Sequence, residues 1–332
     1  MYKFIFMKKI ILLFIPFLGF TQKVVPIKFN SNLVDPTEKV STLYYKDVRE
    51  NKKLAVINFK KEDYQMVLDQ SFGIAIEKRF KEDNPDGEGR ELLLLLEKFE
   101  VFEGKAGEKT VADARIQAAT FEKKGDLYYY IKSINKDIGE QQQQAGKTPK
   151  TMSLFVGRDI SALMKTSYKA KNISSIGVSE IELPNYRTKL TQSLPAYTQS
   201  LKDGIYLSGE DFFNQLPKEG YVLERNDKGK ITQAKSNKDK VSVRKIFAYV
   251  EDNKAYLNTI SGFLPLEKDE KGFYLVSNRG ELEYVPVDST YGMFGLIGGI
   301  VATIDQNDRQ KKAKQQEKYN IYIDALTYKF IY

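Results

Sequence analysis

The sequence predicts an α+β protein of two domains: an N-terminal antiparallel sheet with two helices on one face, followed by a mainly β roll or barrel-like domain with a helical excursion near its end. A chain of 332 residues is long enough to form two cores. Aromatic residues, all of them Tyr or Phe, make up 12% and favour strands. Helix and strand patterns are mixed up to about residue 180, and short strands separated by turn residues follow.

Residues 1–21 have the pattern of an export signal peptide. The basic pair Lys8-Lys9 precedes an apolar run over 10–20, and a start at Met7 would give a more ordinary signal. The run is shorter than the roughly 20 residues that a membrane-spanning helix needs. Because the chain has no Cys, the signal is not of the lipoprotein type. We expect a mature protein in the periplasm or associated with the outer membrane.

The composition excludes several kinds of site. The chain has no Cys and no His, so it has no thiolate nucleophile, imidazole base, or ordinary zinc or haem ligand set. We therefore predict no catalytic residue, no metal site and no cofactor. The signal contains three lysines and no acid, so its removal lowers the formal net charge from +8 to +5. This small excess does not predict a nucleic-acid partner.

The first domain is expected over 23–180. It should begin with extended chain that includes a strand over 53–59, followed by a helix over about 62–80. Apolar residues recur at every fourth position of this helix, namely Tyr64, Leu68, Phe72, Ile76 and Phe80. The sequence EDNPDGEG over 82–89 should end the helix, because Pro and Gly do not continue it.

Three strands of a meander are predicted next, over 91–103, 111–121 and 126–135. The first begins as a continuous apolar run and ends in alternation. The second alternates cleanly and places small residues on one side, where a helix can approach the sheet closely: Ala112, Ala114, Ile116 and Ala118. A second helix over about 152–169 is expected to provide that contact.

Residues 181–202 contain two Pro and are predicted to be a connector to the β-rich domain over 203–332. In that domain Ser208 is expected to cap a short helix, with Asp211 as its partner. Hairpin turns are predicted at 227–229, 252–253, 271–272 and 279–280, and a last strand or hairpin at 319–332.

The β-rich domain resembles a domain found in many exported Bacteroidota proteins of unknown function. The resemblance rests on GIY at 204–206, EDF at 210–212 and YIDALT at 322–327. That family usually has Gly after the Thr, and Tyr328 departs from it. The resemblance implies no activity. In element order, the first domain is similar to the N-terminal domain of TolB and to auxiliary lipoproteins of lipid-transport systems.

The Gly-rich apolar stretch over 291–304 opens a predicted excursion over 291–318. As a helix it would span about 21 Å, short of a hydrocarbon core of about 30 Å, and no Lys-Ser/Thr follows it to make a phosphate loop. Two interpretations stay open: packing on the domain's own sheet, or docking into a partner or membrane interface. The residues predicted to make that docking contact are Met293, Phe294, Leu296, Ile297, Lys311, Lys312 and Lys314.

These patterns together predict a non-catalytic exported protein that binds or scaffolds another component of the cell envelope. One alternative is an enzyme that uses carboxylates or Tyr/Lys on cell-surface glycans. Another is a structural protein peripheral to the membrane. The expected partners are an envelope protein or the membrane interface.

Overall fold

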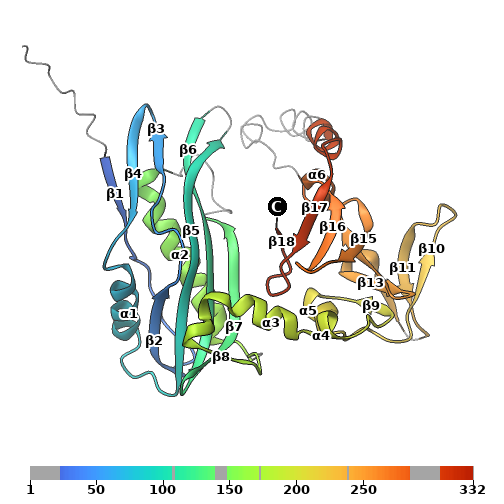
Figure 1. Cartoon of the computed structure of the whole chain (residues 1–332), viewed down its shortest axis with the longest axis horizontal. Coiled ribbons are helices and arrows are strands. Elements are labelled where there is room, and N and C mark those ends of the chain that lie inside the picture. Colours follow the sequence, from blue (N-terminus) through green and yellow to red (C-terminus); the bar gives the residue numbers. More distant parts are fainter. Residues whose placement is uncertain are drawn as a thin grey trace, which may run out of the picture.

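The structure is a computed structural model in which two β-rich domains lie side by side (Figure 1). It describes residues 23–106, 109–138, 148–171, 173–237, 239–284 and 307–331. The predicted signal peptide and the apolar stretch over 291–304 lie outside the described residues. The predicted α+β, strand-rich fold class is confirmed.

A five-stranded sheet forms the centre of the first domain, with the order β2-β5-β6-β7-β8. Its strands are β2 (Val40–Asp47), β5 (Arg90–Ala106), β6 (Lys109–Lys124), β7 (Leu127–Asp137) and β8 (Gly177–Ser179). The β5-β6-β7 meander is antiparallel, as predicted, and β2 joins it in parallel with β5.

The predicted helix over 62–80 is wrong in its first half. Residues 62–68 form β4 (Glu62–Leu68), and the helix α1 (Phe72–Asp83) begins only afterwards. Strand β4 pairs with β1 (Lys23–Ile27) and with β3 (Val56–Phe59). A repeat of four residues is also a multiple of two, so the apolar pattern fitted a strand equally well.

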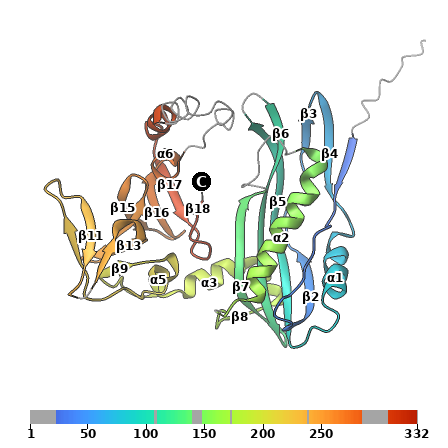
Figure 2. The ribbon, with the colours of Figure 1, turned by 180° about the vertical axis from the view of Figure 1, so that it is seen from behind.

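Two helices cover one face of the five-stranded sheet, as predicted. Helix α2 (Met152–Tyr168) follows a short 3-10 turn, η2 (Pro149–Thr151), in the chain. The helix lies across this face of the sheet, as Figure 2 shows. Helices α1 and α2 meet at Phe80 and Tyr168, whose ring centres are 6.2 Å apart. The small residues of β6 face the same core. The short side chains of the alanines in β6 therefore allow α2 to approach the sheet closely.

Strand β5 is apolar on both faces because both are covered. Leu92 and Leu94 face the core formed with α1 and α2, whereas Leu93 and Leu95 face a second core. The predicted connector provides that second core. It is helical, with η3 (Glu180–Asn185), α3 (Tyr186–Ser193) and α4 (Pro195–Thr198), and it buries Tyr186.

A capping box begins this helical segment and makes it sensitive to acid. The Ser179 amide donates to the Glu182 carboxylate over 2.9 Å, and Lys189 lies 2.9 Å away. The Ser179 amide bond, followed by Lys189 and the Ser179 hydroxyl, lowers the pKa of Glu182 from 4.5 to about 2.

A lowered pKa stabilises the folded state above the ordinary pKa of the carboxyl group, and this contribution disappears as the pH falls through the folded-state value. We therefore expect Glu182→Gln to lose less stability than the wild type between about pH 5 and about pH 2.5. Urea unfolding midpoints across this range measure the effect. Glu219→Gln, at an exposed site, is the control, and equal acid slopes for both variants would contradict the prediction.

The second domain is built on a seven-stranded sheet with the order β18-β17-β16-β15-β14-β13-β9. Its strands are β9 (Gly204–Tyr206), β13 (Ala248–Glu251), β14 (Lys254–Thr259), β15 (Gly262–Lys268), β16 (Phe273–Ser277), β17 (Tyr319–Ile323) and β18 (Phe330–Ile331). A smaller sheet joins β10 (Val222–Arg225), β11 (Ile231–Lys235) and β12 (Lys240–Ser242), which η4 (Val243–Lys245) follows.

The core of this domain lies between the large sheet and the helices α4, α5 (Gly209–Phe213) and α6 (Arg279–Leu282). Ser208 caps α5 as predicted, accepting a hydrogen bond from the Asp211 amide over 3.0 Å. The hairpin turns at 227–229, 252–253 and 271–272 are confirmed, as is the final hairpin of β17 and β18. The turn at 279–280 is wrong, because Asn278 caps a helix there.

Candidate functional site

A β-bulge in β5 orients a side chain at the site where the two domains meet. The pairing of β5 with β6 shifts between Leu96 and Lys98, so Glu97 is an extra residue. The positions that face the α1 and α2 core change there from even numbers, ending at Leu96, to odd numbers, starting at Phe99. A bulge re-aims side chains in this way, and it turns the Glu97 carboxylate toward α3.

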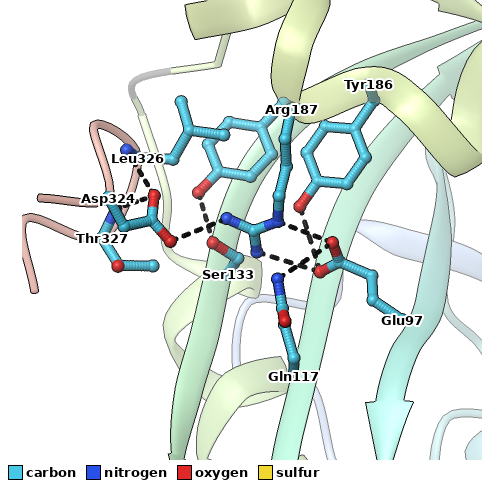
Figure 3. Close-up of polar contacts among 9 residues, drawn as sticks. Glu97, Gln117, Ser133, Tyr186, Arg187, Asp324, Leu326 and Thr327 are labelled. Carbon is cyan, nitrogen blue, oxygen red and sulfur yellow. Dashed lines mark hydrogen bonds and ion pairs between the residues drawn. The ribbon is translucent and has the colours of Figure 1, made fainter. Parts of the chain in front are cut away.

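Arg187, in the first turn of α3, binds acids from both domains (Figure 3). Its Nε lies 2.6 Å from Glu97 Oε1 and its Nη2 lies 3.0 Å from Glu97 Oε2. Its Nη1 donates to Asp324 Oδ2 over 2.9 Å, in the turn between β17 and β18. Tyr186 donates to Glu97 as well, over 3.1 Å. We call the group Glu97, Arg187 and Asp324 the interdomain clamp.

The interdomain clamp is largely shielded from water. The side chains of Arg187, Glu97 and Asp324 are 23%, 12% and 9% exposed. Burial alone would lower the pKa of Arg187, but the hydrogen bonds and charges of its partners outweigh burial and raise it above the usual range. Arg187 is therefore held as a cation, and a planar guanidinium can satisfy Glu97 through two parallel bonds.

The turn that follows Asp324 docks the second domain onto the first. Asp324 Oδ1 accepts hydrogen bonds from the amides of Leu326 and Thr327, over 2.9 and 3.2 Å. These bonds hold the turn in shape, and Leu326 packs on the second core of the first domain, near Tyr130 and Tyr186. One loop therefore supplies both an ionic and an apolar contact between domains.

Tyr328 ends this loop in a left-handed backbone conformation, with φ of 60°. A residue other than Gly rarely adopts this backbone conformation, which costs roughly 1–2 kcal/mol in conformational free energy. The ring of Tyr328 stacks on Phe213, with centres 5.9 Å apart, and covers Gly209, where no Cβ could fit. Gly adopts this left-handed backbone without strain, so it is the residue that suits this position best.

A cleft of about 830 Å³ opens beside the clamp and is lined by both domains. The first domain contributes the end of α2 and part of β7, and the second contributes α5 and the loop after β17. Its apolar lining includes Tyr130, Leu190, Leu194, Phe213, Leu326 and Tyr328. The charged residues at its rim are Lys132, Lys171 and Glu210. This volume lies within the usual range for ligand sites.

Comparison of the chain with protein-family models, curated proteins and solved structures finds no match. Within the described ranges, no helix has the length and apolar character needed to cross a membrane. No group of three or more acids suited to a metal ion occurs among those residues either.

The buried carboxylates of the first domain have structural partners. Asp35 accepts hydrogen bonds from the amides of Thr37, Lys39 and Val40 in its own turn. Asp159 lies 2.6 Å from Lys136 Nζ. Glu122 lies 3.6 Å from Arg90 and 3.4 Å from Lys124. Each of these acids therefore holds part of the fold in place.

The predicted partner contacts divide into two sets. Met293, Phe294, Leu296 and Ile297 lie outside the described residues. Lys311, Lys312 and Lys314 are exposed on a helix over 307–314, and none of the three lines the cleft. Their role in binding stays a prediction.

Helix α6 holds the helix over 307–314 against the second domain. Gln310 donates to the Gly280 carbonyl over 2.6 Å, and Asn278 donates to the Lys314 carbonyl over 3.1 Å. A Cβ on Gly280 would lie closer than 3.0 Å to the backbone of Ala313. The polar part of the predicted excursion therefore packs on its own domain, by an approach that only Gly allows.

We expect Gly280→Ala to displace this helix, because the backbone of Ala313 has no side-chain freedom with which to move aside. Hydrogen exchange of the amides over 307–314 measures the effect, and their protection should be lost. Lys312→Ala, on the exposed side, should keep the protection. Equal protection in both variants would contradict the close-packing argument.

The interdomain clamp was not predicted from the sequence. Its one local signal is in the run LLLLLEKF, where the apolar period changes at Glu97. Nothing near Arg187 or Asp324 in the sequence indicates that they meet, because 137 positions separate them.

Proposed function

We propose that the protein is an exported, non-catalytic binding protein that holds another component of the cell envelope in the cleft between its two domains. The observation that carries the proposal is the cleft of about 830 Å³, to which both domains contribute apolar side chains. A concave surface that combines apolar side chains with a few charged groups favours ligand binding.

The geometry around the cleft supports a pre-formed site. The interdomain clamp fixes the start of α3 to β5 and to the loop after β17. Leu190 of α3 and Leu326 of that loop line the cleft. Walls that are already held in place reduce the ordering cost of binding, which favours affinity.

An enzyme acting on glycans is the less favoured alternative. Glycosidases use two carboxyl groups that face one another across the scissile bond. Of the acids in the described part of the chain, Glu210 alone lines the cleft. A role at the membrane periphery depends on the stretch over 291–304, outside the described residues, and stays a second alternative.

Site-specific photo-cross-linking in the native cell envelope tests the proposal. A benzoylphenylalanine at Leu194, which lines the cleft, should give a defined adduct. The same residue at Ile74, 67% exposed on α1, is the control and should not give that adduct. Ser193→Trp, which fills the cleft, should remove the adduct. The proposal fails if both positions give the same products or if Ser193→Trp has no effect.

A further inference from the structure

The cleft that carries the proposed function has an uneven distribution of charge. Lys132 and Lys171 lie on the wall formed by the first domain, and Glu210 lies on α5 in the opposite wall. Both lysines are exposed, and no carboxylate of the described residues lies within 4.0 Å of either ammonium group. By contrast, Lys136 on the same strand is paired with Asp159 at 2.6 Å. The wall formed by the first domain is therefore cationic.

Part of the cleft lining is apolar and accessible. Leu194, Leu326 and Tyr328 line it and are each partly exposed. Burial raises the pKa of Tyr328 to about 12, so its hydroxyl stays neutral near neutral pH. An apolar ligand body is therefore favoured beside these side chains, because it removes apolar surface from water without desolvating a charge.

The edge of β7 is occupied up to Tyr130, where the cleft begins. The Tyr130 carbonyl accepts a hydrogen bond from the Ser174 amide over 2.8 Å, and Tyr129 beside it pairs with Gly177 of β8. A peptide that binds by adding a strand needs free backbone groups at such an edge. This arrangement disfavours strand addition at Tyr129 and Tyr130, and a ligand at this part of the cleft must bind through its side-chain contacts.

Given that the cleft is the binding site, as proposed above, we infer that its ligand is an acyl chain that ends in an anionic group. The chain lies along Leu194, Leu326 and Tyr328, and the anionic group lies at Lys132 and Lys171. The acyl anion comes either from a free fatty acid or from a membrane phospholipid.

Calorimetric titration of the mature protein with dodecanoate tests the ligand class, with uncharged 1-dodecanol as the matched probe. We expect dodecanoate to bind at least about tenfold more tightly, since a hydrogen bond to a charged group contributes about 1.5–3 kcal/mol and about 1.4 kcal/mol is tenfold. The double variant Lys132→Ala/Lys171→Ala should lose that factor for dodecanoate and keep the affinity for dodecanol. Lys81→Ala/Lys228→Ala, at two exposed lysines outside the cleft, should change neither.

Flotation with phosphatidylglycerol vesicles distinguishes the two sources of the acyl chain. Co-flotation that depends on Lys132 and Lys171, without dodecanoate binding, would assign the chain to a membrane lipid. Dodecanoate binding without co-flotation would assign it to a free fatty acid.

Two results separate failure of this inference from failure of the proposed function. Equal affinity for dodecanoate and dodecanol, with both lost in Ser193→Trp, would overturn the anionic ligand and leave the cleft as a binding site. The absence of any binding, together with cross-linking from Leu194 that Ser193→Trp does not change, would overturn both.

Discussion

Arg187→Ala is expected to lower the free energy of unfolding by about 3 kcal/mol, the largest effect of any substitution at the domain junction. The variant removes the partner of Glu97 and Asp324, whose side chains are only 12% and 9% exposed. Two carboxylates would then stay buried near one another without a cation. Removal of one partner from a buried ion pair costs more than the pair itself contributes, because the remaining charge is not solvated.

Urea denaturation of the mature protein measures this effect. Arg187→Lys should give an intermediate loss, because it keeps the charge and cannot form the two parallel bonds to Glu97. Lys189→Ala is the matched control on the same helix. Its pair with Glu182 is 40% and 43% exposed, so its loss should stay below about 1 kcal/mol. Equal losses of unfolding free energy for Arg187→Ala and Lys189→Ala would show that the interdomain clamp does not stabilise the domain junction.

Gly209→Ala should destabilise the protein by about 1–3 kcal/mol and loosen the loop that docks the two domains. A Cβ at this position would lie closer than 3.0 Å to three atoms of Tyr328, including its own Cβ. These atoms are close to the backbone, so the loop itself must move. Because Leu326 of the same loop lines the cleft, ligand binding should weaken as well.

A double-mutant cycle with Tyr328→Gly tests this explanation. Tyr328→Gly alone should have a small effect, because relief of the left-handed backbone offsets the lost stacking on Phe213. Gly209→Ala in that background should then cost much less than it does alone. If the two losses simply add, the residues do not interact and the proposed contact is wrong.

The sequence determined those features that depend on neighbouring residues. The alternation in β6 placed Ala114 and Ile116 on the buried face, and the same pattern predicted the meander. Ser208 and Asp211 predicted a cap because their separation of three residues suits that bond. In β4 local information was not enough, since Tyr64 and Leu68 are spaced for a helix and for a strand alike.

Only the tertiary structure decided the domain junction. The distance of Arg187 from Glu97 and Asp324 along the chain is 90 and 137 positions, so no local pattern relates them. The bulge at Glu97 depends on how β5 pairs with β6, and the conformation of Tyr328 depends on its contact with Phe213. The physical reason is that periodicity, capping and turn chemistry act over a few residues, whereas burial and charge pairing act between elements that folding brings together.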